Sequence, residues 1–141
     1  MSGRYPYGIK HRYTHMMQDE VAIWERFINN NPDFFVTCDY DFRVGDGVAL
    51  DEDWADNVKR MATMISQKRI DVLGWVGESP TIVELKRRVG LNTLGQVLGY
   101  KALFIRDFPN IKIPEILVIA ESIDEDNIVV MDSFRIPVII V

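Results

Sequence analysis

Residues 69–90 read RIDVLGWVGESPTIVELKRRVG, and they say more about the architecture than any other part of the chain. Two runs within this stretch, 69–77 and 80–86, are rich in β-branched and aromatic residues. A turn-forming cluster of sequence GESP, residues 77–80, connects them. This pattern predicts a β-hairpin.

The same hairpin places charged side chains where chemistry could occur. Side chains alternate along a strand, so we expect Glu84 and Lys86 to project from one face and Val83 and Leu85 from the other. With Asp71 on the first strand, two carboxylates and an ammonium could hold a divalent metal and a water together. The Glu-x-Lys pattern alone is a weak signal, because it arises by chance in about one of every few chains of this size. As an exposed ion pair it would contribute roughly 0–1 kcal/mol and nothing more.

The segment that follows strengthens the interpretation. Residues 92–107 read NTLGQVLGYKALFIRD and predict a helix. Gln96 and Tyr100 are four residues apart and therefore share one flank of that helix. Gly95 and Gly99 each cost about 1 kcal/mol relative to alanine in a helix, so we expect them to mark a close approach to the sheet. Taken alone, Gln96 and Tyr100 are more typical of a solvated glutamine beside an amphipathic tyrosine, but their position one short loop after Glu84 and Lys86 favours a role in the site.

A helix is also predicted over residues 14–29, and it has a carboxylate on its apolar stripe. Glu20 lies one turn from apolar residues on both sides, and an uncompensated buried carboxylate is unfavourable. We therefore expect Glu20 either to approach a metal, to pair with an Arg or Lys elsewhere, or to be exposed by rotation of the helix. The apolar stripe consists of Met17, Val21, Trp24 and Phe27 or Ile28.

The remaining elements alternate between strands and helices. A helix from residue 51 or 53 to 68 has a methionine-rich stripe, which is typical of a core-facing helix. The stripe consists of Trp54, Val58, Met61, Met64 and Ile65. We expect strands at 34–44, 115–120 and 136–141 and a weaker helix at 123–134. This alternation predicts an α/β layer architecture with a mixed sheet.

Composition sets further bounds. A chain of 141 residues with 48% hydrophobic and 26% charged residues is ordinary for one soluble globular domain. The sequence contains no run of about 18 apolar residues, so it predicts no membrane span. The start, MSGRYPYGIKHRYTH, has no hydrophobic core typical of a secretory signal, so we expect a cytoplasmic, intracellular protein. Cys38 is the single cysteine, which excludes an internal disulfide.

The charge distribution bears on partners. A net charge of −5 argues against bulk attraction to nucleic acid. Residues 1–13 nevertheless carry Arg4, Lys10 and Arg12 without an acid, interleaved with tyrosines. We expect this arm either to bind phosphates and stack on bases or to pack locally as a terminus. The rest of the chain, 14–141, is expected to form a single domain.

The order of these residues resembles the PD-(D/E)XK nuclease superfamily. The series is Glu20, Asp71, Glu84-Leu85-Lys86, Gln96 and Tyr100, and its Gln-x-x-x-Tyr element resembles the RecB-like branch. The predicted order of helix, three strands, helix and strand also matches, and the resemblance covers residues 14–141. One departure is that Ile70, rather than a proline, precedes Asp71.

The resemblance implies a restriction-endonuclease-like core, with a central mixed β-sheet flanked by helices, and a Mg²⁺- or Mn²⁺-dependent deoxyribonuclease. It implies that Asp71, Glu84 and the Leu85 carbonyl hold the metal, with Glu20 acting through a water or a second metal. In the same way, Lys86 would orient the attacking water. The resemblance further implies that Gln96 and Tyr100 steady Lys86 and the scissile phosphate. Nearby cations that could meet the nucleic-acid backbone, or simply be solvated, are Arg87, Arg88 and Lys101.

Two other interpretations remain open. One is a nuclease-fold module that binds nucleic acid or a protein partner without cleaving it. The other is an α/β domain in which the pairing of Asp71 and Lys86 is structural. A small acidic protomer has little basic surface to hold a polyanion, so we also expect a homodimer or a partner-dependent enzyme.

Overall fold

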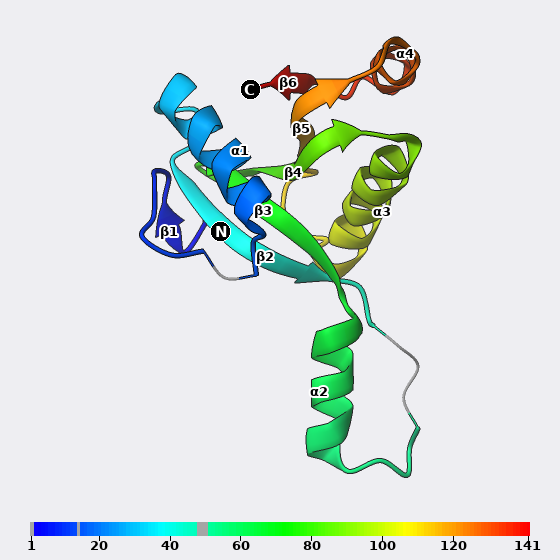
Figure 1. Cartoon of the computed structure of the whole chain (residues 1–141). Helices are drawn as coiled ribbons and strands as arrows, with labels where there is room; N and C mark the ends of the chain where they lie inside the picture. The colour runs from blue at the N-terminus through cyan, green and yellow to red at the C-terminus, as the bar shows by residue number, and fades with distance from the viewer. Residues whose placement is uncertain (1, 14, 48–50) are drawn as a thin grey trace.

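The computed structural model describes residues 2–13, 15–47 and 51–141, and it excludes the side chains of residues 64–66 (Figure 1). The described part contains a six-stranded sheet of order β1-β2-β3-β4-β5-β6. Neighbours are antiparallel from β1 to β4 and parallel from β4 to β6. This is the predicted α/β fold with a central mixed sheet flanked by helices. The elements are β1 (Tyr5–Pro6), α1 (Gln18–Asn30), β2 (Thr37–Val44), α2 (Asp56–Ser66), β3 (Lys68–Val76), β4 (Ser79–Val89), α3 (Leu91–Asp107), β5 (Glu115–Ile123), α4 (Glu125–Ser133) and β6 (Val138–Ile140).

The predicted hairpin is confirmed as β3 and β4. The two strands are antiparallel in a register that runs from Val76 opposite Ser79 to Val72 opposite Val83. Gly77 makes the turn with a φ of 60°, a left-handed conformation that glycine adopts without a steric penalty. The sequence pattern alone was sufficient here, because the turn and the alternation are both local signals.

The helices α1 and α3 cover opposite faces of the sheet (Figure 1). On one face, Trp24 and Phe27 of α1 pack with Val83 of β4. On the other, Phe104 of α3 packs with Ile82 of β4. Each of these aromatic side chains is fully buried and contributes roughly 1.5–3 kcal/mol through removal of its apolar surface from water.

β5 lies between β4 and β6 and has a continuous apolar centre. Residues 116–120 are all buried, which is typical of a parallel strand covered on both faces. α4 follows, and its N-cap Asp124 accepts a hydrogen bond of 2.8 Å from the backbone NH of Asn127. Because parallel strands need a crossover, α3 is the connection that brings β5 beside β4.

The first helix begins later than predicted. α1 starts at Gln18, and Thr14, where the helix was predicted to begin, lies outside the described residues. Met17 is the N-cap and is 66% exposed, so its assignment to the buried stripe was wrong. A residue at the N-cap has extended backbone, and its side chain therefore leaves the helical face that periodicity assigns to it.

The prediction that the methionine-rich helix is a core helix was also wrong. α2 projects away from the sheet (Figure 1). Trp54, Val58 and Met61 are 41%, 49% and 64% exposed, whereas Met64 and Ile65 have side chains outside the described part. Periodicity reveals that a helix has an apolar face, but it does not reveal what covers that face.

The N-terminal segment packs locally against the edge of the sheet. β1 pairs with β2, and the NH of Gly3 donates to the Thr37 hydroxyl at 2.8 Å. The Tyr7 hydroxyl donates to the carbonyl of Asn31 at 2.6 Å. A Cβ at Gly3 would lie 2.6 Å from the Cys38 backbone, so the close approach of these two backbone segments requires glycine. Among the described residues, no helix is both long and apolar enough to cross a membrane.

Candidate functional site

The candidate site begins where β3 and β4 stop pairing through their backbones. One residue beyond the last backbone pair, Val72 with Val83, lie Asp71 on β3 and Glu84 on β4. The NH of Leu85 donates to the Asp71 carboxylate at 3.0 Å. The side chain of Asp71 thus takes the place of a strand neighbour for Leu85, and this bond fixes the carboxylate beside Glu84.

Glu84 is a buried acid, with only 4% of its surface exposed. Its Oε1 lies 3.6 Å from the Lys86 ammonium nitrogen. When both acids are ionised, its Oε2 has no hydrogen-bond partner among the described residues. When Glu84 is protonated, its carboxyl group is within hydrogen-bonding reach of Asp71. The two acids therefore form a pair that can share a proton.

Burial is the main reason why this pair resists ionisation. The pKa of Glu84 is raised to about 9, first by burial and then by the charge of Asp71, against the opposing effect of Lys86. Burial also raises the pKa of Asp71, although the Leu85 NH, the hydrogen bond with Glu84 and the Lys86 charge all lower it. In the metal-free protein the pair therefore retains a proton at neutral pH, and a bound cation would have to replace that proton.

Glu20 approaches the pair from the N-terminus of α1. Its carboxylate accepts a hydrogen bond of 3.1 Å from the NH of Met17, the N-cap residue. Burial raises the pKa of Glu20, and the nearby charge of Asp71 raises it further. The charge of Lys86 lowers this pKa, so a lysine on another element lies near Glu20.

The donor set suits a cation that keeps most of its waters. Within the described ranges, no three His, Cys, Asp or Glu side chains are gathered tightly enough to enclose a metal ion. Asp71 and Glu84 are close to each other. The charge of Asp71 raises the pKa of Glu20, and that of Glu20 raises the pKa of Glu84, but the Glu20 carboxylate is hydrogen-bonded to the NH of Met17. Mg²⁺ commonly uses one or two protein carboxylates and several waters, so the residues present fit this kind of cation.

One flank of α3 faces the same pair. Burial raises the pKa of Tyr100, and the charges of Glu84 and Asp71 raise it further, so its hydroxyl lies near both acids. Gln96 is one turn earlier on that flank, and its Oε1 is buried without a hydrogen-bond partner in the described part of the chain. Tyr100 therefore lies near the acidic pair, and Gln96 lies on the same flank of α3.

The expectation that two glycines hold α3 close to the sheet was wrong. A Cβ placed on Gly95 or Gly99 would meet no described atom within 4 Å. Space for a methyl group exists at both positions, so close packing does not explain these glycines.

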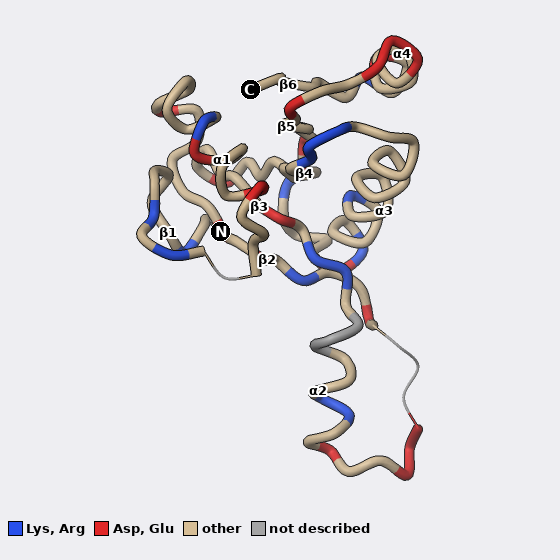
Figure 2. Tube along the Cα trace, in the orientation of Figure 1, with Lys and Arg blue, Asp and Glu red and all other residues tan. Residues whose placement is uncertain are grey.

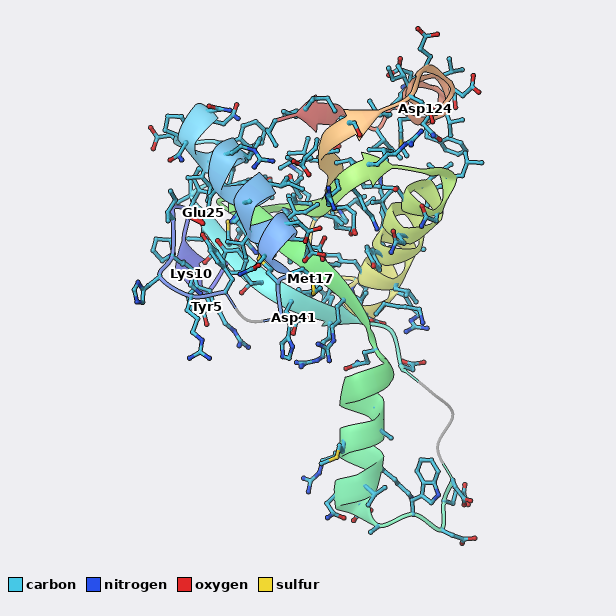
Figure 3. All side chains as sticks on the ribbon, viewed as in Figure 1. Tyr5, Lys10, Met17, Glu25, Asp41 and Asp124 are labelled. Atoms are coloured by element: carbon cyan, nitrogen blue, oxygen red, sulfur yellow. The ribbon has the colours of Figure 1, made fainter. Side chains whose placement is uncertain are left out.

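The predicted nucleic-acid-binding cations lie in separate places (Figure 2). Arg87 and Arg88, at the end of β4, are both exposed and lie 3.4 Å from Glu121 and 3.8 Å from Asp124, respectively. The Lys10 ammonium lies 3.5 Å from the centre of the Tyr5 ring (Figure 3). The remaining three lie on the N-terminal segment or α3 and comprise exposed Arg4, exposed Arg12 and half-buried Lys101.

A second charged cluster next to the pair was missed in the sequence. Asp41 of β2 is close enough to raise the pKa of Asp71. Its carboxylate lies 3.4 Å from Arg69, 3.8 Å from Arg43 and 3.8 Å from His15. The backbone of Asp41 has a φ of 53°, so it interrupts the strand, and simple alternation gives no signal for such an interruption.

Comparison with known proteins adds two distant likenesses. No protein-family model matches the sequence, and no curated protein matches it. A repair endonuclease from Pyrococcus abyssi is similar at 14% identity with a TM-score of 0.49, over 92% of this chain and 49% of that one. A structure of an EndoMS–dsDNA complex is similar at 13% identity with a TM-score of 0.49, over 94% of this chain and 48% of that one. The chain thus spans about half the length of either protein, and the site rests on its own geometry.

Proposed function

We propose that this protein is a metal-dependent nuclease that hydrolyses phosphodiester bonds in DNA, of the RecB-like branch of the PD-(D/E)XK nucleases. The observation that carries the proposal is the buried carboxyl group of Glu84 beside the half-buried Asp71, with Lys86 next to Glu84. Burial makes ionisation of both acids unfavourable, and a positive charge from outside the chain would offset that cost. Acids whose pKa is raised by burial and by a neighbouring charge are typical of functional sites.

The residues that would hold Mg²⁺ or Mn²⁺ are Asp71, Glu84 and the carbonyl group of Leu85. Glu20 would contact the cation through water, which is consistent with its bond to the NH of Met17. The bound cation supplies Lewis-acid stabilisation of the charge that develops on the phosphate. Asp71 is oriented for this role by the Leu85 NH, which holds one of its oxygens at 3.0 Å.

Lys86 would orient the attacking water and stabilise developing negative charge. Its side chain is 24% exposed, so the ammonium reaches solvent while Glu84 holds it from the buried side. The amide of Gln96 and the hydroxyl of Tyr100 would steady Lys86 and the scissile phosphate from α3. An ammonium placed beside the reacting phosphate acts chiefly by electrostatic stabilisation.

The test separates metal binding from cleavage. Single-stranded, duplex and flap DNA are incubated with the protein and with Mg²⁺ or Mn²⁺, and Mn²⁺ binding is measured by titration calorimetry. We expect Lys86→Met to retain Mn²⁺ binding but to cleave at least about 100-fold more slowly, the scale seen when one transition-state-stabilising group is removed. We expect Asp71→Asn to lose both properties, and Arg60→Gln on exposed α2 to lose neither. Cleavage by Asp71→Asn at the parent rate would refute the proposal.

A module that binds nucleic acid or a protein partner without cleaving is the second candidate. It is favoured by one observation, namely that no three acidic, His or Cys side chains converge tightly among residues 2–13, 15–47 and 51–141. Under that alternative the protein binds DNA in the assay above, yet neither Mg²⁺ nor Mn²⁺ produces cleavage. The other alternative, an α/β domain in which the pairing of Asp71 and Lys86 is structural, predicts neither metal binding nor DNA binding.

A further inference from the structure

A cavity of about 540 Å³ lies on the β2 side of the candidate site, between the N-terminal segment and the end of α3. Its volume is within the range of small-molecule sites, roughly 300–1,000 Å³. Four aromatic side chains line it, and they come from three different parts of the chain. These are Tyr5 of β1, Tyr40 and Phe42 of β2, and Phe108 after α3.

Polar groups of both kinds line the same cavity. Arg4 and Arg43 supply hydrogen-bond donors, and Asp39 and Asp41 supply acceptors. The Nε of Arg43 is buried and has no hydrogen-bond partner among the described residues. Arg4 and Arg43 would therefore suit a ligand that offers an acceptor.

Asp41 has a left-handed backbone conformation and lines the cavity. β2 and β3 pair on both sides of it, with Tyr40 opposite Val72 and Phe42 opposite Ile70. Its φ of 53° is uncommon for a residue other than glycine, although aspartate adopts it more readily than most. Tyr40 and Phe42 therefore flank Asp41 on β2. The Asp41 carboxylate forms ion pairs with Arg43, Arg69 and His15.

The lining distinguishes between possible ligands. Asp39 and Asp41 balance the charges of Arg4 and Arg43, so the lining has no excess positive charge to hold a phosphate alone. A purely apolar ligand would leave the buried Arg43 Nε without a partner. A flat heterocycle with donors and acceptors along its edge satisfies both requirements, and aromatic side chains stack on its face.

We propose that this cavity receives one unpaired nucleobase of the DNA strand whose phosphate lies at the Asp71–Glu84 pair. The inference rests on the proposed nuclease function and deepens it, because it specifies a substrate that is single-stranded or locally unpaired. The cavity and the pair are neighbours: Arg69, which bonds to Asp41, lies two residues before Asp71 on β3. Tyr5 and Arg43 are the residues that we assign to stacking and to hydrogen bonding with the base edge.

The Tyr5 ring is already held in position for such a role. It lies 5.9 Å from the Tyr40 ring, and the Lys10 ammonium covers it at 3.5 Å (Figure 3). A cation over one face of an aromatic ring is attracted by the ring's electron density and restricts its motion. This arrangement gives Lys10 a positioning role instead of a direct contact with phosphate.

The test uses 2-aminopurine, whose fluorescence falls when it stacks on an aromatic ring, in the absence of divalent cations so that no cleavage occurs. Three oligonucleotides are compared: a single strand with one 2-aminopurine, the same strand in a full duplex, and a single strand with an abasic position. We expect tighter binding and strong quenching for the first. Tyr5→Leu and Arg43→Gln are each expected to weaken its binding about tenfold, a typical effect of removing a stacking side chain. Arg60→Gln on α2 is the matched control and leaves binding unchanged.

Equal binding of the abasic and 2-aminopurine strands, or quenching that neither substitution changes, would overturn the inference. Circular dichroism checks that Tyr5→Leu is folded, and Arg43→Gln tests the cavity independently of β1. Quenching without any cleavage in Mg²⁺ or Mn²⁺ would support the base site while refuting the nuclease. Cleavage without quenching would refute the base site alone.

Discussion

Replacing Glu84 by glutamine in the metal-free protein should increase stability, and the gain should grow with pH. Glutamine keeps the size of the side chain and can donate a hydrogen bond to Asp71, as protonated Glu84 does. The native state raises the pKa of Glu84 from its ordinary value of 4.5 to about 9. Between these two values the native protein holds a proton that the unfolded chain has lost, so the free energy of unfolding falls as pH rises.

The magnitude follows from the width of that interval. One proton corresponds to about 1.4 kcal/mol per pH unit, so the ionisable side chain costs the wild type roughly 3 kcal/mol by pH 7 relative to pH 4.5. Urea unfolding of the wild type and of Glu84→Gln in EDTA, at pH 5, 6, 7 and 8, measures the difference directly. Glu115→Gln, at an exposed position on β5, is the control.

We expect the difference in unfolding free energy between Glu84→Gln and the wild type to increase steadily from pH 5 to pH 8. Saturating Mn²⁺ should remove it, because the cation takes the place of the proton and stabilises only the native wild type. A difference that stays constant across the pH range would refute the view of Glu84 as a buried acid that resists ionisation. A difference equal to that of Glu115→Gln would do the same.

Three other perturbations test separate parts of the structure. Gly95→Ala should raise the free energy of unfolding by about 1 kcal/mol in thermal or urea melts, because space for a methyl group exists in α3; a loss of stability would contradict this. The double change Arg4→Gln and Arg12→Gln should weaken the salt dependence of DNA binding. The slope of log K against log salt concentration should become shallower by about 0.7–0.9 for each phosphate that is no longer neutralised. An unchanged slope would show that neither residue touches DNA. Light scattering should show a dimer at high micromolar concentration, because an acidic protomer alone offers little surface to a polyanion; a fully active monomer would rule this out.

Local signals in the sequence were enough to predict the part of the molecule that holds the candidate site. The turn at Gly77 and the alternation of β4 fix the register, and the register brings Asp71 beside Glu84. The spacing of Gln96 and Tyr100 likewise placed both residues on one flank of α3. These features depend on residues that are close in sequence, and periodicity is reliable over such distances.

The features that were missed depend on contacts between distant segments. The interruption of β2 at Asp41 is stabilised by His15 and Arg69, which lie on other elements, and no local pattern marks it. The exposure of α2 reflects the absence of a covering element among the described residues, although its periodicity is that of a core helix. Sequence patterns predict which face of an element is apolar, whereas the covering partner is decided by the tertiary arrangement.

The continuity of the hairpin and α3 has a consequence for how the molecule folds. Asp71, Glu84, Lys86, Gln96 and Tyr100 all belong to one uninterrupted segment, β3-β4-α3, and Glu20 alone comes from a distant helix. Contacts within such a segment close short loops, which form faster than contacts between remote parts of a chain. The acidic pair should therefore assemble early, within one cooperative unit, and native-state hydrogen exchange should show the amides of this unit opening together. Docking of α1, and with it Glu20, would then be the later event that completes the site.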